Sequence, residues 1–126
     1  MSIHQEIRFK ASPQKIYAAL TSGSEFGRFT SAPAEIAAIE GGAFSFFGGQ
    51  ISGRNIELAA DKSLVQAWRA KAWPDGVYTI VRITLEKEGD GTRLTLYQSG
   101  IPDGATEHLE AGWHKMYWEP LRTYLA

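Results

Sequence analysis

Histidine is the residue of this chain best suited to hold a metal ion, and the sequence contains three: His4, His108 and His114. Two histidines on one helix share a metal when they lie three or four residues apart, because that spacing puts both on one face. His108 and His114 are six residues apart, so a helix would point them in different directions. The chain has no cysteine to supply a thiolate. We therefore expect no metal site and no other cofactor.

Catalytic motifs are equally scarce. The sequence shows no nucleophile elbow, no phosphate-binding loop and no paired acid motif. The glycine pairs at 41–42 and 48–49 do not open a helix that could hold a phosphate, so we interpret them as turns. These observations favour a protein that binds over one that catalyses, with a small enzyme that uses a few polar pocket groups as an alternative.

Two glutamines are candidate polar groups of a binding site. Gln66 shares the strand parity of Trp68, and Gln98 shares that of Leu96, so both amides are predicted to face the interior. An unpaired amide in an apolar interior would cost about 1–3 kcal/mol. Two interpretations follow: the amides bond each other or water, or they form the polar end of a ligand cavity.

The elements that would position these groups begin with a strand over residues 3–10, where apolar and polar residues alternate. Ser12-Pro13 is typical of a helix start, and Ser22-Gly23 of its end. Another helical turn is expected over 24–31. Short apolar and aromatic runs separated by turn residues then predict antiparallel strands. They lie near 35–40, 43–47, 50–59, 64–73, 77–87 and 92–99.

The last segment, from about Gly104 to Leu125, changes to a helical period, and Pro120 is expected to kink it. One face of this helix should meet the sheet. It comprises Leu109, Gly112, Trp113, Met116, Tyr117, Pro120, Leu121 and Tyr124. The inward face of the sheet should comprise Phe44, Phe46, Trp68, Val81, Ile83, Leu85, Leu94 and Leu96. Any of Trp68, Trp73, Tyr78 and Trp118 that lies outside would form an apolar patch suited to a partner.

Chain length, net charge and the length of the apolar runs limit the possible folds and partners. A chain of 126 residues fits one domain over 1–126, and the order of elements predicts an α+β fold. The net charge of −1 gives no electrostatic surface for nucleic acid, and no apolar run approaches the length of a membrane span. No signal peptide is visible in the first residues. We expect a cytoplasmic protein, either a monomer or a homodimer.

Several stretches carry a family resemblance. They are GGAFSFFGGQISGRNIEL (41–58), Trp68-Arg69, Trp73-Pro74-Asp75-Gly76, GTRLTLYQSGIP (91–102) and AGWHKMYWEPLRTYL (111–125). In this order they resemble the activator of heat-shock protein 90 ATPase homologue domain, a branch of the START-like (SRPBCC) superfamily. The resemblance implies a helix-grip fold, in which a curved sheet of about seven strands wraps the C-terminal helix. It also implies a link to the stress response and a possible chaperone contact.

The superfamily binds lipids, sterols, polyketides and other apolar molecules between sheet and helix, and some members are cyclases or dehydratases. Three hypotheses follow: a binding domain for an apolar or amphipathic molecule, a protein-interaction module, and a small cavity enzyme. For the first we expect a modest cavity between the helix and the central strands. Its predicted ligand-binding residues are Phe44, Phe46, Gln66, Trp68, Val81, Gln98, Trp113, Met116 and Tyr117.

Overall fold

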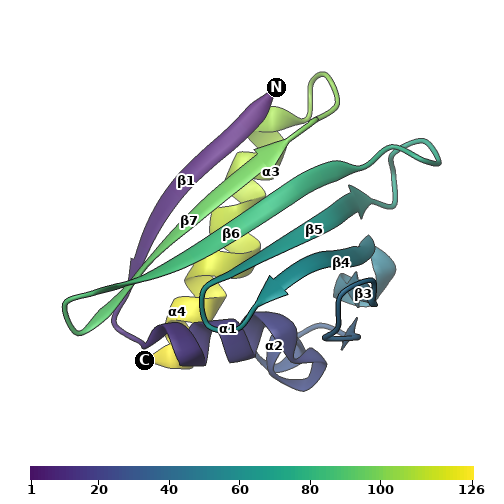
Figure 1. Ribbon diagram of the computed structural model, residues 1–126. Coiled ribbons are helices and arrows are strands. Elements are labelled where there is room, and N and C mark those ends of the chain that lie inside the picture. The colour runs from purple at the N-terminus through teal and green to yellow at the C-terminus, as the bar shows by residue number, and fades with distance from the viewer.

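The computed structural model describes all 126 residues and shows an antiparallel sheet packed against a long C-terminal helix (Figure 1). The strands are β1 (Ser2–Phe9), β2 (Ala34–Ile36), β3 (Ala43–Phe46), β4 (Ile51–Ala59), β5 (Ser63–Ala70), β6 (Thr79–Glu88) and β7 (Gly91–Ser99). The helical segments are α1 (Pro13–Thr21), α2 (Gly23–Thr30), the short turn η1 (Phe47–Gly49), α3 (Thr106–Gly112), η2 (Trp113–Trp118) and α4 (Glu119–Leu125). The predicted α+β helix-grip architecture and its order of elements are confirmed.

The sheet has the order β1-β7-β6-β5-β4-β3-β2, with every neighbouring pair antiparallel. Strands β2 to β7 follow one another as a meander, as the short turns predict. Strand β1 pairs with β7 at the far edge, with Ile3 opposite Gln98 and Ile7 opposite Leu94. The first strand is therefore held against the strand that leads into the final helix.

Serine caps start both short helices. The hydroxyl of Ser12 accepts a hydrogen bond from the Lys15 backbone N–H at 3.3 Å, and Pro13 occupies the first turn of α1. Ser22 ends α1 and caps α2 through the backbone N–H of Glu25, also at 3.3 Å. Figure 1 shows both helices across one end of the sheet, beside the last turn of α4.

Three predicted strands are too long. The strand expected over 35–40 ends at Ile36, because Ile39 and Gly42 donate backbone hydrogen bonds within a tight turn, to Ala37 and Ile39 respectively, at 2.9 Å. The strand expected over 64–73 ends at Ala70, where the Trp73 N–H closes a turn onto the Ala70 carbonyl. The strand expected over 77–87 begins at residue 79. In each case local turn hydrogen bonds replace ladder hydrogen bonds.

Three buried indole N–H groups connect the C-terminal helix to the sheet. Trp113 donates to the side chain of Gln98 on β7, and Trp118 donates to Gln5 on β1, both at 2.8 Å. From the opposite direction, Trp68 on β5 donates to the Tyr117 hydroxyl at 3.3 Å. The helix thus bonds to three strands of the sheet, and all eight residues predicted for the inward face of the sheet are buried beneath it.

The middle of this helix is a π-helix, in which hydrogen bonds span five residues: the Glu119 N–H donates to the His114 carbonyl. Residues five apart therefore share a face, and Trp113 stacks on Trp118 with ring centroids 5.5 Å apart. The wide turn lies directly before Pro120, which cannot make the α-helical bond to the Met116 carbonyl. The backbone keeps helical angles through Glu119, so the proline is accommodated without a break.

Because of the π turn, the α-helical period predicted the burial of Met116 wrongly and did not determine whether Trp118 is buried or exposed. Met116 was predicted to face the sheet, but its side chain is 43% exposed. Trp118, a candidate for the surface, is 1% exposed. An α-helical period of 3.6 residues does not include the extra residue of the wide turn, which brings residue 118 inward.

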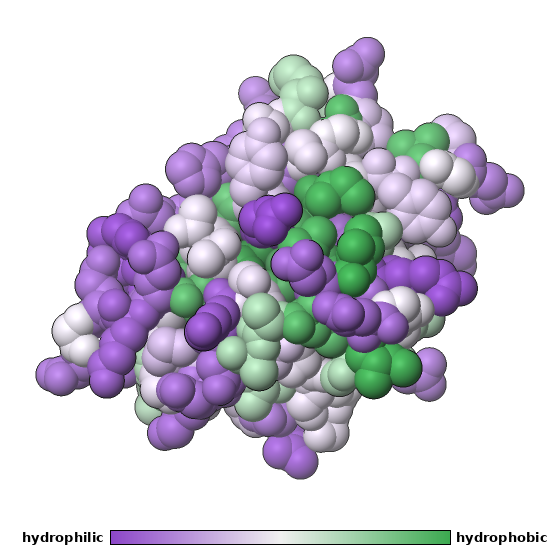
Figure 2. Space-filling model, viewed as in Figure 1, coloured by the Kyte–Doolittle hydropathy of each residue, from purple (hydrophilic) through white to green (hydrophobic).

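The outer face of the sheet is the side seen in Figure 2, where apolar side chains gather over the middle of β5 and β6 within a largely polar surface. Ile80 on β6 and Tyr97 on β7 are 42% and 48% exposed there. Of the aromatic residues considered for a surface patch, Tyr78 is exposed, whereas Trp68 is buried. None of the helices is long and apolar enough to cross a membrane.

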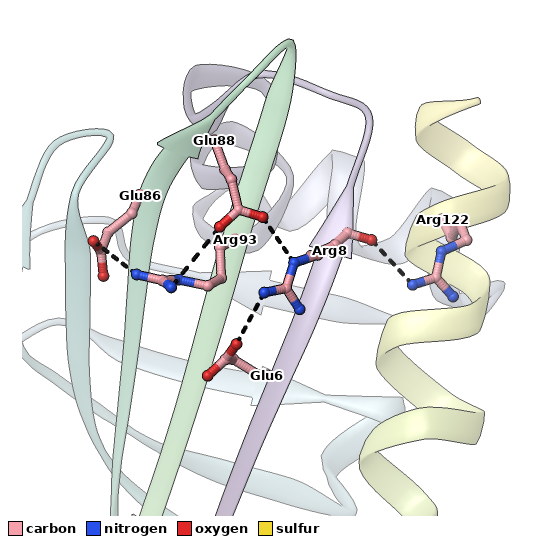
Figure 3. A network of polar contacts seen from close by, with 6 residues as sticks. All are labelled: Glu6, Arg8, Glu86, Glu88, Arg93 and Arg122. Atoms are coloured by element: carbon pink, nitrogen blue, oxygen red, sulfur yellow. Dashed lines mark hydrogen bonds and ion pairs between the residues drawn. The ribbon is translucent and has the colours of Figure 1, made fainter.

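An exposed network of charges ties β1 to its neighbours (Figure 3). Arg8 on β1 donates to Glu88 at 2.7 Å and to Glu6 at 3.3 Å, and its hydrogen bond to Glu88 raises the pKa of Arg8. Arg93 on β7 reaches Glu88 at 3.8 Å. Arg122 on α4 donates to the Arg8 carbonyl at 3.2 Å. Exposed ion pairs contribute little to stability, so the loss of any one of these contacts should have a small effect on the free energy of unfolding.

The register of the C-terminal helix predicts a contrast between two neighbouring residues. Trp118→Ala should lower the free energy of unfolding by about 3–5 kcal/mol, because it empties a buried site and leaves Gln5 without its donor. Met116→Ala, the matched control, should cost less than about 1 kcal/mol at its exposed position. Urea unfolding of both variants measures the difference. Equal costs would contradict the π-helical register.

Candidate binding pocket

A pocket of about 240 Å³ lies between the C-terminal helix and the part of the sheet formed by β4 and β5. Seven of its ten lining residues are hydrophobic. The buried side chains of Trp68, Trp113 and Tyr117 form its inner end, and the exposed Gln50, His108 and Met116 form its rim. The complete lining is Phe47, Gln50, Ile51, Trp68, His108, Leu109, Gly112, Trp113, Met116 and Tyr117.

The turn η1 builds the wall opposite the helix. Phe47, Gly48 and Gly49 all have positive φ angles, of 55°, 65° and 95°, so the chain reverses sharply after β3. The two glycines adopt positive φ at little steric cost, whereas Phe47 is a bulky residue in a region that its type rarely adopts. The reversal separates two adjacent aromatic residues: Phe46 is buried in the core, whereas the half-buried Phe47 lines the pocket.

The inner end is a cluster of aromatic rings. The rings of Trp113 and Tyr117 lie 4.2 Å apart, and those of Trp68 and Trp113 lie 5.6 Å apart in a stacked arrangement. Burial strongly raises the pKa of Tyr117, and the hydrogen bond from Trp68 opposes this only in part. The phenol is therefore protonated and neutral across the physiological pH range.

The structure brings four of the nine predicted ligand-binding residues to this pocket: Trp68, Trp113, Met116 and Tyr117. The other five are buried in the core and do not line it: Phe44, Phe46, Gln66, Val81 and Gln98. Strand parity identifies which side chains point inward, but a pocket forms only where inward side chains fail to meet across the interior.

The two glutamines are buried as predicted, and each amide has at least one hydrogen-bond partner in the protein. Gln98 accepts from the Trp113 indole at 2.8 Å and donates to the Thr79 hydroxyl at 3.0 Å. Gln66 donates to the buried side chain of Asn55 at 3.2 Å. The two amides are not hydrogen-bonded to each other, and neither glutamine lines the pocket. Their partners are polar side chains on neighbouring strands and on the helix.

Sequence reasoning missed six lining residues as site residues. Leu109 and Gly112 lie on the predicted inward face of the helix, so a signal for them was present. His108 precedes that face and lies at the rim. The segment 47–51 gave no usable signal, since alternation does not apply across a turn with positive φ angles.

A sheet that wraps one long helix, with an apolar pocket between them, defines a helix-grip domain. Within that class, the family model described as Activator of Hsp90 ATPase homolog 1-like protein matches residues 10–126, and the chain belongs to this family.

Curated relatives carry related names. The chain is 32% identical to human activator of 90 kDa heat shock protein ATPase homolog 1 over 114 residues, which is 90% of this chain and 34% of the relative. It is 34% identical to the homologue from Dictyostelium discoideum over 108 residues, covering 85% of this chain and 28% of the relative. The chain thus spans about a third of the length of these curated relatives.

Solved structures share the fold. An HSP90 activator from Plasmodium falciparum superimposes with a TM-score of 0.94 at 24% identity, covering 99% of this chain and 96% of that one. The Aha1 dimer from Colwellia psychrerythraea gives 0.84 at 22% identity, with coverage of 99% and 96%. CalU16 from Micromonospora echinospora gives 0.84 at 24% identity, with coverage of 99% and 76%. At these identities the likeness establishes the architecture.

The buried phenol predicts a specific loss of stability in alkali. The unfolded chain releases the Tyr117 proton above about pH 10, whereas the folded protein retains it because its pKa is raised. The contribution of the Tyr117 phenol to the free energy of unfolding is therefore complete below about pH 10. Above that pH it declines, by at most about 1.4 kcal/mol per pH unit. Tyr117→Phe should remove this part of the decline, as measured by urea unfolding between pH 8 and 11.

Tyr97→Phe is the matched control, since it makes the same chemical change at an exposed position on the outer face. This variant should follow the parent protein at every pH. If Tyr117→Phe also keeps a constant stability difference from the parent protein across pH 8–11, the buried phenol does not contribute as described.

Proposed function

We propose that this protein binds a small apolar or amphipathic molecule in the pocket between its sheet and its C-terminal helix. One observation carries the proposal: an apolar pocket whose inner end is built from three buried aromatic side chains and whose rim is exposed. Ligand sites are typically concave and mostly apolar, with a few polar groups that fix orientation. This pocket has that composition.

The size of the pocket limits the ligand. Sites for drug-sized molecules occupy about 300–1,000 Å³, and this pocket holds about 240 Å³. The ligand is therefore smaller than a sterol or a long-chain lipid, unless part of it extends past the rim. Gln50 and His108 are the polar side chains available at that rim. They replace Gln66 and Gln98 as the proposed contacts for a polar end.

Gly112 allows a direct test of the pocket. It lines the pocket, and a Cβ built on it meets no atom within 4 Å. Its φ angle of −62° suits any residue in a helix. The Cβ of a residue at 112 therefore meets open space, so the ring of Gly112→Phe should occupy the pocket and abolish ligand binding, while Gly112→Ala, the matched control, should bind as the parent protein does.

Binding is measured with a panel of small aromatic compounds, short fatty acids and sterols, by calorimetry and by the rise in melting temperature that a ligand produces. Gly112→Phe should retain the parent far-ultraviolet circular dichroism and a cooperative melt. The proposal fails if no compound binds the parent protein. It also fails if Gly112→Phe binds as well as Gly112→Ala.

Family membership favours a second candidate function, contact with heat-shock protein 90. Such a contact would use the surface and not the pocket. Ile80, Tyr97 and Tyr78 are exposed, and Figure 2 shows apolar side chains gathered on the outer face of the sheet. The test is ATP turnover by heat-shock protein 90 with and without this protein. Stimulation that is equal for the parent and Gly112→Phe would support a surface function that is independent of the pocket.

For either function we infer a cytoplasmic protein in which residues 1–126 act as one domain. We also infer that it works as a monomer or as a homodimer. Sedimentation at several concentrations distinguishes these two states.

A further inference from the structure

The hydroxyl of Tyr117 has one unused hydrogen-bonding capacity. A phenol can accept and also donate, whereas an indole N–H can only donate. The hydrogen bond between Trp68 and Tyr117 therefore has a fixed direction, with the Tyr117 oxygen as acceptor at 3.3 Å. The hydroxyl proton is left over, and no hydrogen bond in the protein takes it up.

The surroundings of the phenol explain why the protein offers no acceptor. Its ring contacts other aromatic rings: Phe26, Phe47 and Trp113 lie at centroid distances of 5.5, 5.7 and 4.2 Å. Other indoles nearby do not compete for the proton, because an indole has no acceptor atom. Tyr117 is also one of the three buried residues that line the inner end of the pocket. A buried donor without an acceptor is costly, so a guest in this pocket would gain by supplying one.

The residues that line the pocket indicate which class of ligand it would bind. No lysine or arginine lines the pocket, so a carboxylate placed at the inner end would lose its hydration without a countercharge. Flat aromatic walls favour a planar ring system, which stacks or packs edge-on against them. The volume of about 240 Å³ accommodates one ring or two fused rings.

We propose that Tyr117 is the recognition residue of the pocket and donates its hydroxyl proton to a neutral oxygen acceptor, a carbonyl or an ether, on a small planar aromatic ligand. This inference rests on the proposed binding function and specifies the ligand class of the same site. Trp68 acts as a positioning residue, because its indole occupies the phenol oxygen and turns the proton away from itself.

The test compares two probes of nearly equal shape, 1-tetralone and 1-methylenetetralin, in which a CH₂ group replaces the carbonyl oxygen. Calorimetry gives the affinity ratio of the two probes for each variant. The parent protein should prefer the ketone by about fivefold, the effect of one neutral hydrogen bond. Tyr117→Phe should abolish the preference and leave the affinity for 1-methylenetetralin unchanged within about twofold.

Two further variants distinguish the effect of the Tyr117 hydroxyl from the effects of another phenol and of the neighbouring indole. Tyr97→Phe removes a phenol hydroxyl from the outer face and should keep the preference. Trp68→Phe retains the Tyr117 hydroxyl but removes the indole N–H that directs its proton, so its preference for the ketone should be smaller than that of the parent protein; an unchanged preference would overturn the positioning role of Trp68.

Equal binding of both probes to the parent protein would overturn the role of Tyr117 while leaving the proposed binding function intact. This comparison does not depend on the folding of any variant. A preference that survives in Tyr117→Phe would overturn it as well. If neither probe binds the parent protein and the wider panel also fails, the binding function and this inference fall together.

Discussion

A buried tryptophan must find an acceptor for its indole N–H, and this requirement fixes how the C-terminal helix lies on the sheet. Trp113 and Trp118 face the interior, and the sheet supplies one glutamine acceptor for each, Gln98 on β7 and Gln5 on β1. An α-helix would not present residues five apart on one face. The π turn does, and it therefore allows the helix to reach two adjacent strands at once.

The same attachment explains where the pocket lies. The helix is held against β1 and β7 by its two tryptophans, at one edge of the sheet. Strands β3 and β4 lie toward the other edge, where the turn η1 places the ring of Phe47 edge-on to that of Tyr117 on the helix. Trp68 is the only indole that bonds to the helix from this side. The pocket occupies the part of the interface that the glutamine contacts do not close.

The sequence predicted the architecture well, because alternation and turn residues are local signals that the sheet obeys. Gln66 and Gln98 were placed inside correctly on parity alone. Their partners, Asn55 and Trp113, lie on other elements and depend on sheet and helix register, which parity does not determine. The site was predicted less well: Phe47 owes its place in the lining to positive φ angles, and Met116 lines the pocket as predicted but is exposed at its rim because of the π turn. Neither feature has a periodic signature.

The π turn also has an evolutionary consequence. A π segment is what an α-helix becomes when one residue is inserted, so deleting one residue between 113 and 118 would restore regular geometry. Trp113 and Trp118 would then lie four positions apart, about one α-helical turn, so the residues beyond the deletion would keep their faces. Leu121 and Trp118 would therefore remain in the core. Turns such as 71–78 tolerate insertions at little entropic cost. The π segment likewise allows the C-terminal helix to change its length by one residue without changing which residues face the core.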